Sequence, residues 1–214
     1  TEFYVHFKER SKLLDGVFVF AGGTSTLRTD NRVERIPMGF PSNEMYSTLG
    51  IPPQLGRVPL TEDGDRVVLI SDRLWRTWFG ADPSVIGRSY FISGAMRQVI
   101  GIMPPEFQFP SDETMLWVAS EIRLDQIRPG QLGPVIVARM KEGVTREQLA
   151  GELTGLSKEL PARFGGPPNY ARLIEQHRAV VEPALDRIVG PSVRTSLWVL
   201  LGAVSMVLLI ACAN

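Results

Sequence analysis

The last twenty residues of the chain carry no charged side chain, and this run constrains the fold more than any other feature. From Leu197 to Ala213 the sequence reads LWVLLGAVSMVLLIACA, in which almost every residue is apolar or small. A helix of this run would be about 26 Å long, close to the ~30 Å hydrocarbon core of a bilayer. The run therefore predicts the start of a transmembrane helix, which we place at residues 193–214.

The alternative is a buried helix in the core of a soluble domain. Core helices of soluble domains usually keep a polar face, whereas this run has only Ser205 to offer one. The composition favours the membrane helix, and dependence on detergent would separate the two structures.

The rest of the chain has the composition of a globular protein. Of its 214 residues, 44% are hydrophobic and 21% are charged, which excludes disorder for most of the chain. Lys and Arg count 23, as do Asp and Glu, so the net charge is zero and a nucleic-acid partner is not expected. One cysteine, Cys212, and two histidines, His6 and His177, exclude an intrachain disulfide and a Cys- or His-rich metal site.

Hydrophobic periodicity and turn residues predict a mixed succession of helices and strands. Helices are expected at residues 1–15, 44–49, 72–79 and 145–164, and strands at 17–20, 24–27, 32–38, 67–70, 89–92, 97–102, 116–119, 135–140 and 178–182. Gly22 and Gly23 are interpreted as a turn. The outer segments combine strands and helices, whereas the middle is mostly strands and turns. This pattern predicts an α+β fold with the middle section inserted into the outer one.

The sequence offers few candidates for chemistry. It contains no P-loop, no dinucleotide-binding fingerprint and no Gly-x-Ser-x-Gly nucleophile elbow. Glu62, Asp63 and Asp65 could bind calcium, but the other ligands of an EF-hand are missing, so a solvated loop is favoured. We predict no catalytic, cofactor-binding or metal-binding residues.

Two further features have a functional and a structural interpretation. Trp75, Trp78 and Phe79 could line a ligand pocket, but their one-sided helical spacing beside the strand at residues 67–70 favours a core role. Cys212 could be a reactive thiol, but its apolar surroundings favour inert packing.

Several segments, in this order along the chain, resemble one family. They are LGIPPQLGR (49–57), VVLISDRLWRTWFGADPSVIGRSYFISG (67–94), QVIGIMPPEFQFP (98–110), ARMKEGVTREQL (138–149) and WVLLGAVSMVLLIACAN (198–214). Together they are similar to the MacB-like periplasmic core domain of ABC-transporter permeases, in particular the FtsX-like, acidobacterial duplicated type. The last segment resembles the beginning of the second membrane span in such permeases.

The resemblance implies an extracytoplasmic domain with two lobes between two membrane helices. A porter-like α/β lobe would comprise residues 1–57 and 133–191, and a mostly-β lobe residues 58–132. The transmembrane helix would begin within residues 193–214. Residues 1–191 would lie on the periplasmic side of a bacterial inner membrane.

The resemblance also implies a function in transport rather than catalysis. A separate or fused cytoplasmic ATPase would hydrolyse ATP, and the permease, expected to be a dimer in membrane lipid, would couple this to export or other periplasmic work. The family's type member works with a periplasmic adaptor protein and an outer-membrane channel. The connecting segment 186–195 is expected to be stiff because Pro183 and Pro191 fix φ at two points. The alternative is an ordinary linker whose prolines only end a strand.

Two alternatives stay open. One is a lipoprotein-releasing permease of the same superfamily, which the neighbouring coding sequences would identify. The other is a soluble binding or hydrolase domain with a buried C-terminal helix.

Overall fold

The structure is a computed structural model that describes residues 1–29, 31–131, 133–184, 199–202, 204–206, 208 and 211. Residues Thr1–Ala179 form one compact unit and Val180–Asn214 a second. The elements follow in the order α1 (Glu2–Arg10), β1 (Leu14–Arg28), β2 (Val33–Pro41), α2 (Glu44–Leu49), β3 (Leu55–Gly56), β4 (Val67–Ser71), α3 (Asp72–Phe79), β5 (Ser89–Ile92), β6 (Ala95–Met103), β7 (Leu116–Val118), β8 (Val135–Met140), α4 (Arg146–Ser157), α5 (Leu160–Phe164) and α6 (Tyr170–Gln176). Single turns of 3₁₀-helix lie at Thr61–Asp63, Pro83–Val85 and Leu124–Gln126.

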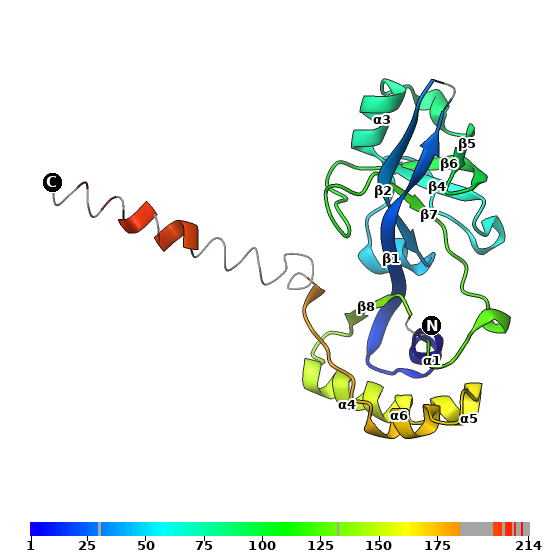
Figure 1. Ribbon diagram of the computed structural model, residues 1–214, viewed down its shortest axis with the longest axis vertical. Helices are drawn as coiled ribbons and strands as arrows, with labels where there is room; N and C mark the ends of the chain where they lie inside the picture. Colours follow the sequence, from blue (N-terminus) through cyan, green and yellow to red (C-terminus); the bar gives the residue numbers. More distant parts are fainter. Residues whose placement is uncertain are drawn as a thin grey trace. The chain divides into compact units, whose positions relative to one another are not determined.

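Strand β1 is a continuous strand of 15 residues that runs the length of the first unit (Figure 1). At about 3.3 Å per residue it extends over roughly 50 Å. It pairs antiparallel with β2 from Phe20↔Pro41 to Arg28↔Val33. The turn predicted at Gly22 and Gly23 is therefore wrong, because the ladder with β2 continues on both sides of the two glycines and keeps them extended.

Six strands close on themselves into a barrel. Their pairing order is β2-β7-β4-β6-β5-β1, and β1 pairs with β2 again. The pairs β2–β7 and β4–β6 are parallel, and the others are antiparallel. Closure satisfies the strand edges within the barrel. The barrel interior contains Leu27, Ile36, Met38, Val68, Ile70, Ile92, Val99, Ile102, Leu116 and Val118.

Helix α3 packs against this interior. Its N-terminus is capped by Ser71, whose side chain accepts a hydrogen bond from the Leu74 N–H at 3.1 Å. It ends at Gly80, which has the positive φ of 58° that favours glycine. Leu74 and Trp75 are buried in the barrel core, which confirms the predicted helix and its apolar side.

A second core lies on the other side of β4. Val67 and Leu69 face it, while Val68 and Ile70 face the barrel interior, so both faces of β4 are buried as the apolar run predicts. Other members of this core are Phe18, Phe20, Met45, Tyr46, Ile100, Met103, Phe107 and Trp117. Helix α2 thereby packs against the first half of β1.

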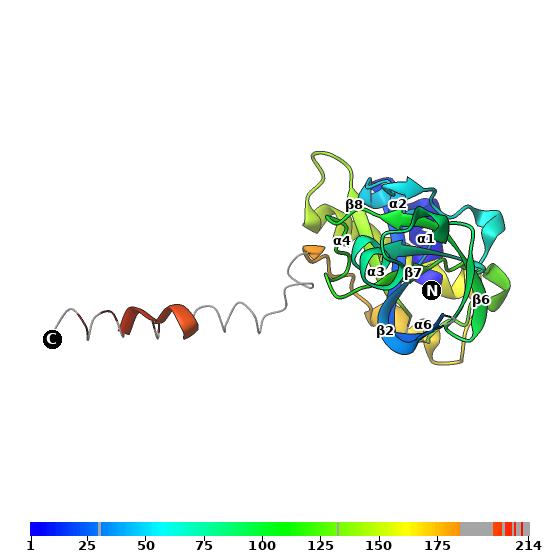
Figure 2. The same cartoon turned by 90° about the horizontal axis from the view of Figure 1, so that it is seen from above.

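The end of the compact unit opposite the barrel is helical, with α1, α4, α5 and α6 near strand β8 (Figures 1 and 2). Strand β8 pairs antiparallel with the first half of β1. Thr145 caps α4 through a capping box with Gln148. Its side chain accepts from the Gln148 N–H at 3.2 Å, and the Gln148 side chain accepts from the Thr145 N–H at 2.9 Å.

Three predicted elements at this end need correction. Helix α1 ends at Arg10 rather than near residue 15, because Ser11 takes an extended conformation and β1 begins at Leu14. The single helix predicted at 145–164 is two helices, and Pro161, which lacks an N–H, lies in the first turn of the second. Residues 178–182 form no strand, since the Ala179 N–H donates to Thr154 Oγ1 instead of to a ladder.

The predicted division into lobes at residues 1–57, 133–191 and 58–132 stays a prediction. Packing does show that Leu27 and Ile36 share the barrel core with β4 and β6. The fold is thus mixed α/β, with β1 and β2 contributing to the barrel and β1 also pairing with β8 at the helical end.

The second unit has helical residues at 199–202 and 204–206. Among its described residues, the large exposed apolar side chains are Val180, Val199, Leu200, Leu201, Val204, Met206 and Leu208. Among the residues that the structure describes, no helix combines the length and the apolar character needed to cross a membrane. Much of the predicted transmembrane helix at 193–214, and all of the predicted stiff segment at 186–195, lie outside the described residues.

Candidate functional site

Helix α1 is bound through its side chains to elements that come much later in the chain. We call this set of bonds the α1 anchorage and define it by Glu2, His6, Lys8 and Glu9 of α1 and by Ser11, which directly follows the helix. Each of these residues contacts a partner on α2, α4, α5, α6 or the loop at Gly130. The anchorage makes α1 the element through which the helical end is held together.

Glu2 lies at the buried side of the anchorage, with 1% of its surface exposed. Its Oε1 accepts hydrogen bonds from the Gly130 N–H at 3.0 Å and from the Tyr170 hydroxyl at 3.2 Å. Burial acts to raise the pKa of Glu2, but the hydrogen bond from Gly130 and other stabilising contacts outweigh it and hold that pKa below its usual value. An ionised carboxylate therefore joins α1 to the Gly130 loop and to α6.

His6 is also buried, and its ring contacts residues of α5 and of the position just before it. Its Nδ1 is 3.0 Å from Arg163 Nη1, and its Nε2 is 3.2 Å from Glu159 Oε2. Because a guanidinium can only donate, Nδ1 must accept, and the ring proton is then assigned to Nε2, facing Glu159. Burial lowers the pKa of His6, with Arg163 and Arg10 acting in the same direction and Glu159 against it. Arg163 also pairs with Glu9 at 2.6 Å.

Lys8 and Glu44 form an ion pair between α1 and α2 at the edge of a polar pocket. The pocket has a volume of about 300 Å³ and lies between α1, α2, β1 and β8. Its other lining residues include Ser11, Asp15, Gly16, Ser47, Thr48 and Arg139. Burial acts to raise the pKa of Glu44, but the bond from Lys8 leads the contacts that lower it overall. The pocket is lined by charges of both signs, from Lys8, Asp15, Glu44 and Arg139.

A β-bulge shapes this pocket. Leu14 pairs with Met140 and Gly16 with Arg139, so Asp15 is the extra residue. A Cβ at Gly16 would lie 2.8 Å from Thr48 Oγ1, so glycine lets β1 approach α2 closely. The sequence does not predict this pocket, because the helix expected at residues 1–15 leaves no place for a β-bulge at Asp15.

Two of the three acidic residues of the candidate calcium loop, Asp63 and Asp65, are paired with arginines. Arg57 binds Asp63 with two bonds of 2.6 and 2.8 Å, and Asp63 also accepts from the Leu60 N–H. The bond from Arg57 is the main cause that lowers the pKa of Asp63 to about 2. Asp65 binds Arg97 at 3.1 Å. Throughout the described ranges, no group of three or more His, Cys, Asp or Glu side chains could hold a metal ion.

The aromatic residues of α3 have structural contacts. Trp75 is buried, and its Nε1 donates to the Asp82 carbonyl at 2.9 Å. Trp78 and Phe79 are partly buried against the barrel core. The Arg32 guanidinium lies over the Trp78 ring at 4.1 Å. These contacts agree with the core role that their spacing favours.

The remaining candidates do not assemble into a site. The His177 ring packs against Phe3, with centroids 4.9 Å apart, and burial lowers its pKa. Cys212 lies outside the described residues. Nothing in the spacing of the sequence could have revealed the α1 anchorage, because Glu2 and His6 are more than a hundred residues from their partners.

Comparison with known proteins identifies the fold. A family model described as the MacB-like periplasmic core domain matches residues 6–156. The periplasmic region of MacB from Actinobacillus actinomycetemcomitans is similar with a TM-score of 0.56 at 16% identity, covering 80% of each chain. The extracellular domain of the noncanonic ABC-type transporter YknZ from Gram-positive bacteria is similar with a TM-score of 0.57 at 15% identity, covering 85% of this chain and 87% of that one. No curated protein matched in the sequence comparison.

Proposed function

The chain belongs to the family of MacB-like periplasmic core domains, the extracytoplasmic domains of ABC-type transporter permeases, and we propose that it transmits motion driven by a cytoplasmic ATPase to the periplasmic side. In this role the domain is not an enzyme. Its work is mechanical and requires a rigid connection between the part that receives motion and the part that delivers it.

The observation that carries this proposal is the participation of one strand, β1, in three hydrophobic cores. Val17 and Val19 pack with Tyr4 and Val5 of α1. Phe18 and Phe20 pack in the core under α2, and farther along, Leu27 packs inside the barrel. Cores are close-packed and resist deformation, so a strand fixed in all three moves them together.

The α1 anchorage supplies the other half of the connection. Because α1 precedes β1 by a short link, a displacement of α1 reaches β1 through Tyr4 and Val5 and through the chain itself. Lys8 and Glu44 couple the same displacement to α2. We infer that α1 is the input element and the barrel the output element.

The proposal includes a setting for the domain. We place it in the inner membrane of a bacterium, with residues 1–191 in the periplasm and a membrane helix starting within residues 193–214. An ABC ATPase subunit would hydrolyse the ATP, since this chain has no P-loop. A periplasmic adaptor, an outer-membrane channel and a second permease copy belong to the same proposal.

Interrupting β1 tests the mechanism in the complete permease reconstituted with its ATPase. Two glycines inserted between Gly22 and Gly23 keep the in–out alternation of the strand but loosen it between the second core and the barrel. A donor dye on Asn31, at the exposed β1–β2 turn, and acceptor dyes in the bilayer report movement of the barrel by energy transfer.

We expect an ATP-dependent change in energy transfer in the unmodified permease and loss of most of it in the insertion variant, with ATP hydrolysis continuing. The matched control inserts two glycines after Gly143, in an exposed turn with open space around it, and should keep the change. Thermal unfolding verifies that both variants are folded. An unaltered response in the β1 variant, or none in the unmodified permease, would mean that β1 does not transmit motion.

A further inference from the structure

We propose that the outer side of the barrel binds a partner-protein segment that carries carboxylates beside apolar side chains. The binding surface is formed by Arg28, Val33, Arg35, Phe91 and Met96, and we call it the β1–β5 face. It has no role in the packing described above.

The strand register places most of these residues in one row. Arg28 is paired with Val33 on β2 and with Phe91 on β5, and Phe91 is paired with Met96 on β6. Paired residues of neighbouring strands point to the same side of the sheet. The next pair along, Leu27 and Ile92, is buried inside the barrel, so the row points outward.

The apolar members of the row are exposed to solvent. The exposed fractions are 57% for Val33, 38% for Phe91 and 59% for Met96. Protein interfaces are enriched in phenylalanine, methionine and arginine and depleted in acidic residues and lysine. The β1–β5 face has this composition at adjacent positions of four strands, and methionine adapts its shape readily to a partner.

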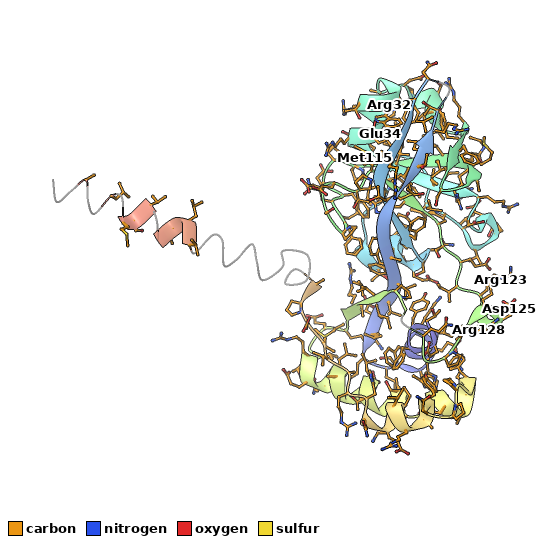
Figure 3. The ribbon with its side chains drawn as sticks, in the orientation of Figure 1. Arg32, Glu34, Met115, Arg123, Asp125 and Arg128 are labelled. Atoms are coloured by element: carbon orange, nitrogen blue, oxygen red, sulfur yellow. The ribbon has the colours of Figure 1, made fainter. Side chains whose placement is uncertain are left out.

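The charge of the face is positive. The Arg28 guanidinium lies over the Phe91 ring at 5.6 Å, and Arg35 donates to the Thr24 carbonyl at 3.3 Å. Within the part of the chain that the structure describes, neither arginine forms an ion pair. On the other side of β2, by contrast, Arg32 is paired with Glu34 at 2.6 Å, and Figure 3 labels both near the barrel end of the unit.

The positive charge of the β1–β5 face determines which kind of partner it can bind. A second copy of the same face would bring arginines against arginines, which is unfavourable. A segment with glutamate or aspartate next to leucine or phenylalanine complements both the arginines and the apolar row. An anionic membrane has similar chemistry, but α1 lies at the end of the unit opposite the β1–β2 turn (Figure 1). Under the proposed function, on which this step rests, the chain enters from the membrane through α1, and the barrel points away from it.

Peptide binding to the full 214-residue chain in detergent micelles tests the proposal, with fluorescence anisotropy as the readout. The probe is a short labelled peptide in which glutamates alternate with leucine and phenylalanine, and a lysine counterpart serves as its charge-reversed control. We expect the glutamate peptide to bind roughly fivefold or more tightly than the lysine peptide, as two exposed ion pairs can provide.

The double variant Arg28→Gln, Arg35→Gln should remove this preference, and Met96→Ser should weaken binding of the glutamate peptide. Arg73→Gln, on the exposed side of α3, is the matched control and should change neither. Equal binding of the two peptides, or an unchanged preference in the double variant, would overturn the proposal.

Binding to lipid vesicles tests whether the β1–β5 face contacts a membrane instead of a protein. If phosphatidylglycerol vesicles bind the chain more than phosphatidylcholine vesicles, and the double variant loses this difference while the glutamate peptide does not bind, then the face is a membrane contact and the proposal is wrong. No arm of the experiment uses ATP, so its failure is distinct from failure of the β1 mechanism.

Discussion

The Arg163 guanidinium donates a hydrogen bond across 3.0 Å to Nδ1 of His6, joining α5 to the first helix of the compact unit. Protonation of His6 would replace this hydrogen bond with a repulsion, because Nδ1 would then carry a proton facing a cation. Glu159 on the other side of the ring compensates only in part.

This geometry predicts a stability that depends on pH. Burial lowers the pKa of His6 in the folded chain, so the unfolded chain binds a proton at higher pH than the folded chain does. The free energy of unfolding therefore has its full value above the ordinary histidine pKa of 6.5. It falls as pH decreases through that value toward the lower pKa of His6 in the folded chain. His6→Gln should therefore reduce the fall in melting temperature between about pH 7.5 and pH 5.5. His177→Gln removes the other histidine with a lowered pKa, and it measures how much of the pH dependence of the melting temperature comes from His177 instead of His6.

The buried carboxylate of Glu2 predicts a second measurable effect. Tyr170→Phe removes one of the donors to Glu2 Oε1 without changing the packing of the ring. We expect a loss of about 1–3 kcal/mol in the free energy of unfolding, since the remaining carboxylate is buried with one bond fewer. Chemical denaturation measures it, and Tyr90→Phe, whose hydroxyl makes no hydrogen bond among the described residues, is the control. Equal effects of the two variants would contradict this role of Glu2.

The aromatic residues of α3 should differ in importance. Trp75 is buried and bonded to Asp82, whereas Trp78 is only partly buried and its ring is covered by Arg32. Trp75→Ala should destabilise the chain by about 3–5 kcal/mol, the usual range for a buried aromatic, and Trp78→Ala by less. Thermal unfolding compares them. A Trp78 variant that lost function at full stability would instead place Trp78 in a binding site.

Gly56 offers a test of backbone packing. A Cβ at this position would lie 2.1 Å from the Ile100 carbonyl oxygen, where β3 pairs with β6, and its φ is +79°. Gly56→Ala should therefore cost more than the ~1 kcal/mol of an unfavourable φ alone. Gly80 has a φ of +58° in the left-handed helical region and open space around it, so Gly80→Ala isolates the conformational part. If the two variants lost equal stability, the close approach to β6 would have no energetic effect.

Local signals in the sequence predicted much of the fold. Ser71 and Gly80 delimit α3, and Thr145 with Gln148 starts α4, because a cap depends on residues only three or four positions apart. The β5–β6 hairpin was likewise predictable, since its turn uses positive φ at Ser93 and Gly94.

Long-range relationships could not be predicted in the same way. Whether Gly22 and Gly23 turn or continue depends on the ladder with β2. Closure of the barrel depends on parallel pairing of β2 with β7, far apart in the chain. The α1 anchorage joins Glu2 to Tyr170, and no periodicity within either segment records that contact. The β1–β5 face could not be predicted either, because it depends on the register that places Phe91 between Arg28 and Met96.

The passage of β1 through three cores also determines how the unit comes apart. A strand that contributes to the barrel and to the helical end cannot leave one of them without disturbing the other. Residues Thr1–Ala179 should therefore unfold in one cooperative transition, and a fragment limited to residues 58–132 would lack two of the six strands of the barrel, β1 and β2. The same connectivity that suits the domain to carrying force makes it indivisible as a folding unit.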